Sequence, residues 1–538
     1  MRPLLSCAAA AELDALTRGE YGIAADRLME LAAARILDAI AAEGLWPASG
    51  EVDGGARRAD AGRAGAAEPI RVAAICGSGG NAGDALALLR MAAFKGERGL
   101  AAVIPERLGE LAAARAREAA AAGVRLLELG SAEADEAVAE AALVIDAVAG
   151  TGVRGPLRGP ALRAAELCAA ARGRLVALDL PSGVGPYDAR PGGPRPSPDD
   201  APPGPVPPRA ELTVCVAPRK LELYYPAFRS LAGRIAAAEG VFPFDRVEAA
   251  AEARLLEEAD LAGLLPRLAP EAHKGIRGSV GVYGGALGAL GAGLVASRAA
   301  SAAGAGVVTF VVRDESYAQA AGRVQGPIVR PLSMGAGRRL DAALVGPGFG
   351  LDRTAEAALD ELWDAAAPLV VDADALRLVA RRAGRRSRAA PLVMTPHPGE
   401  LAALAAAAEG RPGDPEAIAL AGERWRYDAA ALAVETARAY GAALVCKDAT
   451  SFIAAPDGAL AVWDGREPSL GVGGSGDALA GFIAGLLARG ASAWDAARAG
   501  VAAHGLAGRR LAALKGFYDA GELPEALAAL AYERTKHG

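Results

Sequence analysis

The chain contains 538 residues with a net charge of -6, and this length exceeds what one hydrophobic core ordinarily supports, so more than one domain is expected. Hydrophobic residues make up 52% of the chain and aromatic residues only 4%, which favours small-residue helices packed closely on sheets. Acidic and basic residues are interspersed, and this argues against a nucleic-acid partner and a basic membrane-binding surface. The five cysteines are scattered without CxxC pairs, and no apolar run is long enough to span a membrane, so we expect a cytoplasmic protein without structural zinc.

Short apolar runs bounded by glycine alternate along the chain with longer segments rich in Ala, Leu, Glu and Arg. These runs predict strands at residues 70–76, 143–147, 174–180, 211–216, 279–283, 306–312, 342–345, 369–372, 392–395 and 442–446. Because nearly every residue of each run is apolar, helices are expected on both faces of each sheet. The pattern predicts an α/β protein whose functional residues gather at the carboxyl ends of parallel strands.

Two domains of similar size are predicted, covering residues 1–245 and 250–538. The boundary follows a strand-like run at Gly240–Asp245, where a charged stretch begins. Within the first domain, residues 185–209 contain the sequence PGGPRPSPDDAPPGPVPP. This composition is unable to bury a core and predicts a flexible surface insertion.

Three predicted strands of the N-terminal half end in polar, glycine-rich segments. The loop CGSGGNAGD occupies residues 76–84, Asp146 precedes AVAGTGVRGP, and Asp179 precedes LPSG. Glycines let a phosphate or a ribose approach the backbone, and clustered oxygen donors favour a hard cation. Because the ends of parallel strands lie side by side, we expect one shared site.

The C-terminal half contains a glycine-rich loop, GVGGSGD at residues 471–477, that opens a predicted helix. Backbone N–H groups at a helix N-terminus attract anions, and Asp477 stands beside them as a potential base. A tight turn capped by an aspartate is the simpler alternative for such a loop in isolation. The other motifs are HKG at 273–275, GPGFG at 346–350, TPHPGE at 395–400 and KDATS at 447–451.

The N-terminal half resembles the YjeF N-terminal family, the NAD(P)H-hydrate epimerases, in GGNAGD, DAVAGTG, LDLPSG and the downstream APRK at 217–220. The resemblance implies a Rossmann-like three-layer sandwich, a potassium ion held by Asn81, Asp146 and Ser182, and a catalytic Asp179 at the reacting ring. The residues that it implies contact the hydrate are Gly80, Asn81, Ala82, Gly83, Asp84, Gly150, Thr151, Gly152, Val153, Arg154, Gly155, Pro156 and Asp179. The chain departs from the family at Leu31 and Gly80, where Asn is usual.

The C-terminal half resembles the ADP-dependent NAD(P)H-hydrate dehydratases, which have a ribokinase-like α/β/α sandwich. The resemblance implies that Asp477 is the catalytic base, which accepts the hydroxyl proton of the hydrate while the nucleotide donates a phosphoryl group. The residues implied to bind the hydrate are Ala292, Gly348, His397 and Asp477, and those implied to bind ADP, with Mg²⁺, are Lys447, Asp448, Ala449, Thr450, Ser451 and Gly476. Asp448 replaces a family glycine, and its charge is expected to repel phosphate by roughly a kcal/mol.

Together the two resemblances imply a bifunctional repair enzyme, an isomerase fused to a lyase. The first half would interconvert the R and S hydrates of NADH and NADPH, called NADHX and NADPHX, and the second would dehydrate the S form with ADP. One alternative is a small-molecule kinase of the ribokinase-like superfamily. Another is a dehydratase fused to a non-catalytic N-terminal module that binds nucleotide or dimerises. The expected partners are these small molecules and further copies of the chain in a homo-oligomer.

Overall fold

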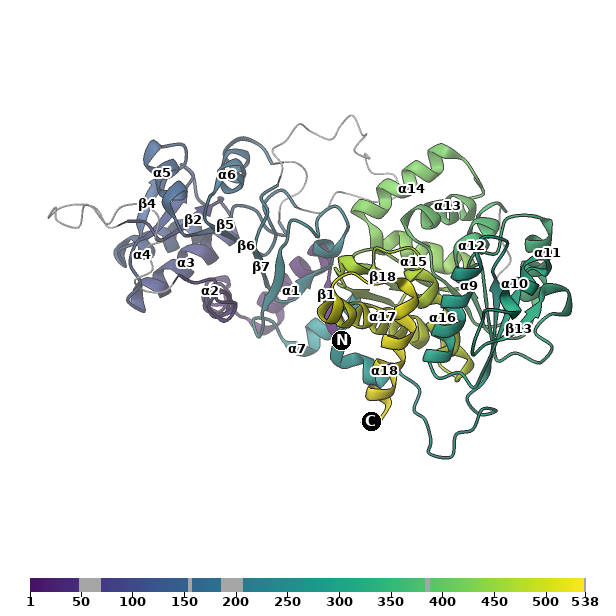
Figure 1. Ribbon diagram of the computed structural model, residues 1–538. Helices are drawn as coiled ribbons and strands as arrows, with labels where there is room; N and C mark the ends of the chain where they lie inside the picture. Colours follow the sequence, from purple (N-terminus) through teal and green to yellow (C-terminus); the bar gives the residue numbers. More distant parts are fainter. Residues whose placement is uncertain (48–68, 153–156, 185–206, 383–387, 537–538) are drawn as a thin grey trace. The chain divides into compact units, whose positions relative to one another are not determined.

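The structure is a computed structural model, and it describes residues 1–47, 69–152, 157–184, 207–382 and 388–536 (Figure 1). The chain divides into two compact units, an N-terminal unit of Pro3–Glu252 and a C-terminal unit of Met1–Arg2 with Ala253–Gly538. Of the insertion predicted at 185–209, only residues 207–209 lie within the described ranges.

The sheet of the N-terminal unit is parallel at every pair of neighbouring strands, in the order β4-β3-β2-β5-β6-β7-β9. Its strands are β2 (Val72–Cys76), β3 (Leu100–Ile104), β4 (Arg125–Glu128), β5 (Leu143–Ala147), β6 (Arg174–Leu178), β7 (Leu212–Val216) and β9 (Arg234–Ala238). The strand order reverses between β2 and β5. In sheets of this type, ligands bind outside the carboxyl ends of the strands at such a reversal.

Helices cover both faces of this sheet. They are α1 (Cys7–Tyr21), α2 (Ala25–Ala42), α3 (Gly80–Phe94), α4 (Glu110–Ala121), α5 (Ala132–Glu140), α6 (Gly159–Ala170) and α7 (Phe244–Ala249). Alternate residues of β2 point to opposite faces, so Val72 and Ala74 pack with α2, α3 and α4, while Ala73 and Ile75 pack with α5 and α6. The predicted three-layer sandwich is confirmed. Two short strands, β1 (Arg2–Leu5) and β8 (Arg219–Lys220), pair in parallel, and the 3-10 helix η1 (Leu221–Tyr224) follows them.

The sheet of the C-terminal unit follows the order β13-β12-β11-β14-β15-β16-β17-β18-β19-β10. Its strands are β10 (Ala253–Leu255), β11 (Ser279–Gly284), β12 (Val307–Val312), β13 (Ile328–Pro331), β14 (Ala342–Val345), β15 (Leu369–Val371), β16 (Leu392–Met394), β17 (Ala443–Cys446), β18 (Ser451–Ala454) and β19 (Leu460–Trp463). The strands pair in parallel from β13 to β17, as predicted, and β18 pairs antiparallel with both of its neighbours. The functional loops that follow β11, β14, β15, β16 and β17 therefore emerge at one edge.

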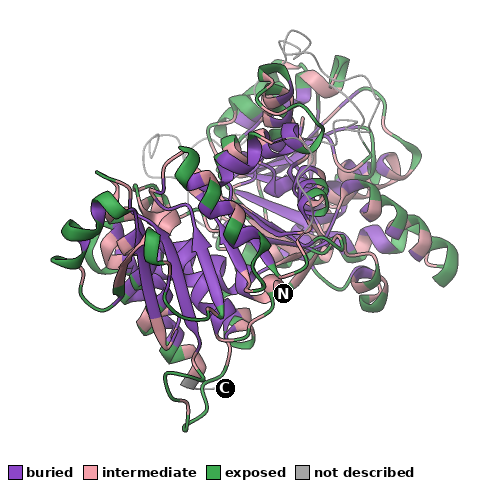
Figure 2. Cartoon of the chain, turned by 90° about the vertical axis from the view of Figure 1, so that its right-hand side faces the viewer, coloured by how far each residue is buried: buried purple, intermediate pink, exposed green. Residues whose placement is uncertain are grey.

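Helices also flank this second sheet, whose strands form a buried layer in Figure 2. They are α8 (Leu261–Leu264), α9 (Leu290–Ala302), α10 (Tyr317–Ala321), α11 (Arg353–Asp364), α12 (Ala373–Ala380), α13 (Pro398–Ala408), α14 (Pro415–Tyr427), α15 (Ala429–Tyr440), α16 (Ser475–Ala488), α17 (Ala493–Lys515) and α18 (Leu523–Lys536). Short 3-10 helices are η2 (Glu258–Asp260), η3 (Asp314–Ser316), η4 (Leu332–Met334), η5 (Pro468–Leu470) and η6 (Ala520–Glu522). One apolar cluster joins α9, α16, α17 and α18 to the sheet.

Helices α9 and α16 approach each other through small residues. A Cβ atom added to Gly481 would lie 2.0 Å from the carbonyl oxygen of Ala296, and one added to Gly485 would lie 2.5 Å from that of Ala300. Both distances are far below van der Waals contact, so the two backbones touch and any larger side chain is excluded. This contact fixes the position of α16, whose first turn carries Asp477.

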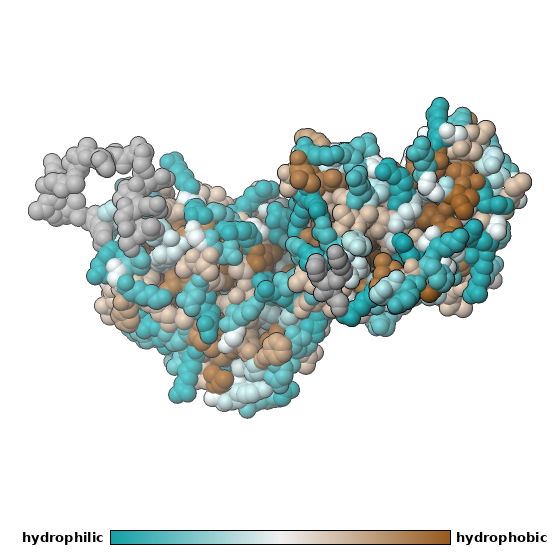
Figure 3. Space-filling model, turned by 60° about the horizontal axis from the view of Figure 1, so that its bottom comes forward, coloured by the Kyte–Doolittle hydropathy of each residue, from teal (hydrophilic) through white to brown (hydrophobic). Residues whose placement is uncertain are grey.

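Hydrophilic residues cover most of the face drawn in Figure 3, and hydrophobic ones form small groups between them. None of the helices in the described ranges combines the length and the apolar content that crossing a membrane requires.

Candidate active sites

The first candidate site lies at the reversal between β2 and β5 in the N-terminal unit. Helix α3 begins at Gly80 directly after β2, and its Asn81 side chain donates hydrogen bonds from Nδ2 to the carbonyl oxygens of Ala149, at 3.1 Å, and Leu178, at 3.0 Å. A Cβ atom on Gly150 would lie 2.6 Å from Asn81 Oδ1, so glycine is required there. Asn81 therefore ties together the ends of three neighbouring strands.

Asp146 and Ser182, the other two predicted cation ligands, form a fully buried pair. Asp146 Oδ2 accepts from the Ser182 backbone N–H at 2.7 Å, and Asp146 Oδ1 accepts from Ser182 Oγ at 2.5 Å. Ser182 Oγ also accepts from the N–H of Ala149 at 3.1 Å, which links the pair to the loop held by Asn81. Burial raises the pKa of Asp146, although its hydrogen bonds with Ser182 oppose the shift. Among the described residues, no basic side chain forms an ion pair with this carboxylate.

Asp179 stands at the end of β6 with its backbone in the left-handed region, at φ 68°. Its Oδ1 lies 2.6 Å from the Nζ of Lys220, and its Oδ2 accepts from the N–H of Thr151 at 3.4 Å. The carboxylate thus faces the Gly150–Gly152 segment.

Asp84 lies in the first helical turns of α3, among the predicted hydrate-contacting residues 80–84. Burial raises its pKa well above the usual range, and the negative charges of Asp179 and Asp14 add to the shift. The structure therefore brings residues 80–84, 150–152 and Asp179 to one sheet edge. Four other predicted contacts, Val153, Arg154, Gly155 and Pro156, lie outside the described residues.

The second candidate site lies at the start of α16 in the C-terminal unit. Gly474 precedes the helix in a left-handed conformation, at φ 96°, and Asp477 occupies the first turn. Burial raises the pKa of Asp477 to about 7, the charge of Asp372 adds to the shift, and Lys447 opposes it. A carboxylate with such a pKa is suited to accept a proton near neutral pH.

Lys447 supplies a positive charge at this helix N-terminus. Its Nζ lies 2.7 Å from Asp372 Oδ1, which also accepts from Thr395 Oγ1 at 2.8 Å. A Cβ atom on Gly476 would lie 3.2 Å from the same Nζ. The ammonium is therefore held between a buried carboxylate and the anion-binding turn of α16.

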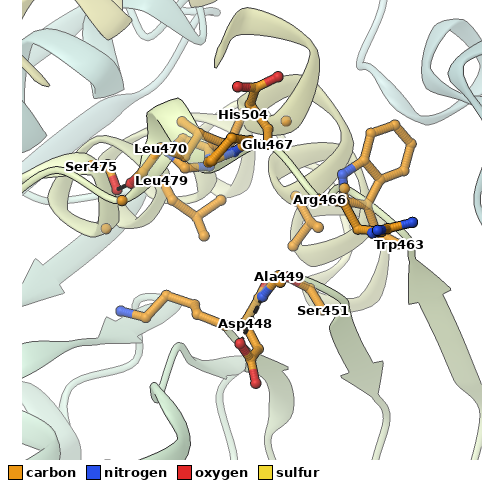
Figure 4. A pocket seen from close by; sticks show the side chains of 17 residues that line it. Asp448, Ala449, Ser451, Trp463, Arg466, Glu467, Leu470, Ser475, Leu479 and His504 are labelled. Carbon is orange, nitrogen blue, oxygen red and sulfur yellow. Dashed lines mark hydrogen bonds between the residues drawn. The ribbon is translucent and has the colours of Figure 1, made fainter. Parts of the chain in front are cut away.

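A cavity of about 330 Å³ opens beside this turn (Figure 4). Its lining includes Lys447, Ser475 and Gly476 at the anion-binding turn, and Leu470, Leu479 and Val501 as apolar walls. Of the predicted ADP-binding residues, Lys447, Asp448, Ala449, Ser451 and Gly476 line it. Thr450 is not in the lining; it is buried and donates from Oγ1 to Asp464 at 3.1 Å.

The Asp448 carboxylate is directed away from the cavity in Figure 4. It accepts hydrogen bonds from Nε1 of Trp425 on α14, at 3.1 Å, and from the N–H of Ala449, at 2.7 Å. The negative charge of this predicted ADP-binding residue is thus oriented toward an indole N–H group rather than toward the cavity.

His504, which belongs to none of the sequence motifs, lies on α17 and lines the cavity. Burial lowers its pKa to about 4, despite a hydrogen bond with the Ser475 backbone. Its Nε2 is buried without a hydrogen-bond partner in the described structure. A single histidine in a helix rich in Ala and Gly gives no sequence signal, and only its position against the first turn of α16 brings it into the site.

The predicted hydrate-binding residues lie at neighbouring strand ends of the same sheet edge. Ala292 is in the first turn of α9, and a Cβ atom on Gly348 would lie 2.7 Å from the carbonyl oxygen of Ala289, next to that turn. His397 caps α13, where its Nδ1 accepts from the N–H of Gly399 at 3.1 Å and its own N–H donates to Glu400 at 3.0 Å. The cap fixes the imidazole, whose Nε2 lies 3.5 Å from Glu400 Oε1, and the side chain stays 58% exposed.

A buried carboxylate of near-neutral pKa, a glycine-rich helix N-terminus and an adjoining cavity at the edge of a parallel sheet are typical of a nucleotide-dependent α/β enzyme. The family model described as NAD(P)H-hydrate dehydratase matches residues 280–529, and the one described as YjeF-related protein N-terminus matches residues 25–216. The bifunctional NAD(P)H-hydrate repair enzyme Nnr of Moorella thermoacetica is 31% identical, over 95% of this chain and 93% of its own length. The chain belongs to the family of bifunctional NAD(P)H-hydrate repair enzymes.

Two further relatives match the C-terminal half. An ADP-dependent (S)-NAD(P)H-hydrate dehydratase of Xanthomonas campestris is 38% identical, over 46% of this chain and 85% of that protein. A solved ADP/ATP-dependent NAD(P)H-hydrate dehydratase of Bacillus subtilis is 24% identical, with a TM-score of 0.46, and the match covers 53% of this chain and 99% of that one. The families predicted from the two sets of motifs are confirmed.

Proposed function

We propose that the C-terminal unit uses ADP to dehydrate the S hydrates of NADH and NADPH, and that the N-terminal unit interconverts the R and S hydrates. The observation that carries this function is the position of Asp477, whose pKa is raised to about 7, in the first turn of a helix that opens onto a nucleotide-sized cavity. Fusion of the two activities lets a dehydratase that accepts one epimer consume both.

Dehydration requires the hydroxyl group on the reduced nicotinamide ring to become a good leaving group. Asp477 accepts the proton of the hydrate's hydroxyl group. At the same time the oxygen of that hydroxyl group takes the terminal phosphoryl group of ADP, and AMP is released. The C–O bond then breaks, phosphate departs, and loss of a ring proton restores NADH or NADPH. The N–H groups of the turn at Gly474–Gly476 and the ammonium of Lys447 stabilise the charge on the transferring group.

Ala292, Gly348 and His397 are proposed to hold the hydrate, and residues 447–451 with Gly476 are proposed to hold ADP. The described part of the chain contains no group of three or more His, Cys, Asp or Glu side chains placed to hold a metal ion. Mg²⁺ is therefore proposed to enter with the nucleotide phosphates and their water, which is its usual mode of binding.

The function is tested by incubating the purified chain with mixed R and S NADPH hydrates and following the absorbance of the reduced nicotinamide. With ADP we expect complete conversion to NADPH together with AMP and phosphate, and without nucleotide we expect none. A plateau at the S fraction alone would show that the N-terminal unit does not epimerise. A stable phosphorylated product would instead identify a small-molecule kinase.

A potassium ion is proposed at Asn81, Asp146 and Ser182 in the N-terminal unit. These residues supply amide, carboxylate and hydroxyl oxygen atoms, the donors that hard cations prefer. The Asp146 carboxylate is fully buried and has no basic partner among the described residues, so a bound cation would offset the cost of burying its charge. The ion would hold the three strand ends together. Self-association of the chain is a separate prediction.

Removal of potassium is expected to slow the exchange of R and S hydrates about tenfold or more and to lower the melting temperature of the N-terminal unit. Both effects should disappear in Asp146→Asn, which no longer buries a charge. Exchange and calorimetry are measured in potassium and in tetramethylammonium buffers, with dehydration of the S hydrate as the internal control. Equal exchange rates in both buffers would exclude the potassium site.

A further inference from the structure

Lys220 and Asp179 form a deeply buried ion pair in the N-terminal unit. The Nζ to Oδ1 distance is 2.6 Å, and the two side chains are 2% and 7% exposed. Burial by itself lowers the pKa of Lys220, but the charge of Asp179 and further interactions outweigh it, so the pKa of Lys220 is raised. A fully charged ammonium therefore sits behind the carboxylate proposed to act on the hydrate.

This ammonium contacts the protein on several sides. Besides its contact with Asp179, Nζ donates to the carbonyl oxygens of Val216, at 2.8 Å, and Pro218, at 3.1 Å. The Asp179 contact is an ion pair, and the Lys220 side chain is only 2% exposed, so the ammonium is enclosed by the protein. Lys220 consequently acts on the reaction only through Asp179.

The surroundings of Asp179 are rich in acidic groups. Cys7 on α1, Asp84 on α3 and Cys215 on β7 each interact with the charge of Asp179. One step further out, Asp14 interacts with Asp84, Glu222 on η1 with Cys7, and Arg219 on β8 with Cys215. Burial raises the pKa of Glu222 and of Asp84, so both carboxyl groups are disfavoured as anions. Of these carboxylates, Asp179 is the one in direct contact with a buried ammonium.

The geometry also fixes the direction of the carboxylate. The left-handed backbone of Asp179, at φ 68°, is a conformation that non-glycine residues adopt rarely and hold only where their surroundings enforce it. With Oδ1 engaged by Lys220, Oδ2 is the oxygen that faces Thr151 and the glycine segment of the site.

We infer that Lys220 is a positioning residue for epimerisation, which supplies the counter-charge to the buried Asp179 carboxylate and aims its Oδ2 at the hydrate. The inference rests on the proposed epimerase function of the N-terminal unit. An ionised carboxylate accepts a proton from the hydrate, whereas a protonated one is unable to do so. Without the ammonium, a buried carboxyl group takes up a proton at higher pH, and the base is lost in the neutral range.

The test compares Lys220→Met with Arg219→Met in the full-length chain. For Lys220→Met we expect the rate of exchange between R and S hydrates at pH 7 to fall about tenfold or more. The acid side of the pH–rate profile should move to higher pH by about one unit or more. Arg219→Met removes a charge from the adjacent residue, whose partner is the exposed Glu239 at 3.8 Å, and should leave the profile in place. An unchanged acid side in Lys220→Met, whatever its rate, would overturn the inference.

A stability measurement tests the pair without relying on epimerisation. The melting temperature of Lys220→Met should fall further below that of the parent as pH rises from 4 to 8, because an unpaired carboxylate destabilises the fold only when ionised. A difference independent of pH would contradict the inference. If Lys220→Met does not fold, Lys220→Arg takes its place, because arginine keeps the positive charge. The acid side of its pH–rate profile for hydrate exchange should lie within about half a pH unit of the parent's. A larger shift would overturn the inference. A parent chain that exchanges no hydrate would refute the epimerase function, and the melting series would still decide the role of Lys220.

Discussion

Asp477→Asn is expected to slow ADP-dependent dehydration by about a hundredfold or more, because the variant retains the shape of the site but loses the group that accepts the hydroxyl proton. Exchange of R and S hydrates by the N-terminal unit should continue at the parental rate. The measurement is the initial rate of NADPH formation from the pure S hydrate, with ADP binding followed by calorimetry. Dehydration within about tenfold of the parent would remove Asp477 from the role of base.

The pKa of Asp477 gives this prediction a pH dependence. Because burial raises that pKa to about 7, dehydration should decline below about pH 7 as the base becomes protonated. The raised value also means that the folded state holds a proton that the unfolded chain releases, so ionisation of Asp477 costs stability as pH rises from about 4 to about 7. Asp477→Asn should therefore be at least as stable as the parent at pH 8.

Asp374→Asn is the matched control for this variant. The carboxylate of Asp374 accepts from the N–H of Gly350 at 2.9 Å, and an asparagine oxygen preserves that bond. Its negative charge contributes to the raised pKa of Asp477. Its removal should move the acid side of the dehydration profile to lower pH while the maximal rate persists. A loss of rate as large as that of Asp477→Asn would mean that the base has been assigned to the wrong carboxylate.

Gly481→Ala is expected to unfold or strongly destabilise the C-terminal unit. The added methyl group would lie 2.0 Å from the backbone oxygen of Ala296, and α9 and α16 would have to separate to admit it. Overpacking of this kind costs about 1–3 kcal/mol or more, equivalent to a fall of about 5 °C in melting temperature for a unit of this size. Dehydration should fall with it, because α16 carries both Asp477 and the anion-binding turn. Calorimetry measures the transition, and hydrate exchange shows that the N-terminal unit survives.

Gly422→Ala is the control, because this substitution is expected to raise stability rather than lower it. Gly422 lies inside α14, and a Cβ atom there would have no neighbour within 4 Å. Replacement of a glycine by alanine in an unobstructed helix stabilises a protein by about 0.5–1 kcal/mol. A melting temperature for Gly481→Ala equal to or above that of Gly422→Ala would show that α9 and α16 are not in backbone contact.

The central strands were predictable because a strand covered on both faces consists of apolar residues throughout, as at 342–345 and 443–446. The strand at 125–128 was not predicted, because it has Arg and Glu at its ends and lies at the edge of its sheet. A strand exposed in this way lacks the continuous apolar run. The strand at 100–104 is fully apolar but was also missed, because its Ala-rich sequence resembles that of the neighbouring helices.

The sequence motifs identified the candidate site residues, but they did not indicate which other residues these side chains contact. The sequence contains APRK without indicating that Lys220 reaches Asp179, which lies in a different strand connection. The ion pair of Lys447 with Asp372 likewise joins residues 75 positions apart. Such contacts depend on how strands order in the sheet, and spacing along the chain carries no information about them.

The hydrogen bond between Trp425 and Asp448 couples two positions of the proposed nucleotide-binding site. The indole at position 425 holds the carboxylate at position 448 aside. Substitution of Trp425 alone would release a negative charge toward the nucleotide, whereas loss of Asp448 alone would leave only a buried N–H group without its acceptor. The two single substitutions are therefore expected to have unequal consequences for nucleotide binding.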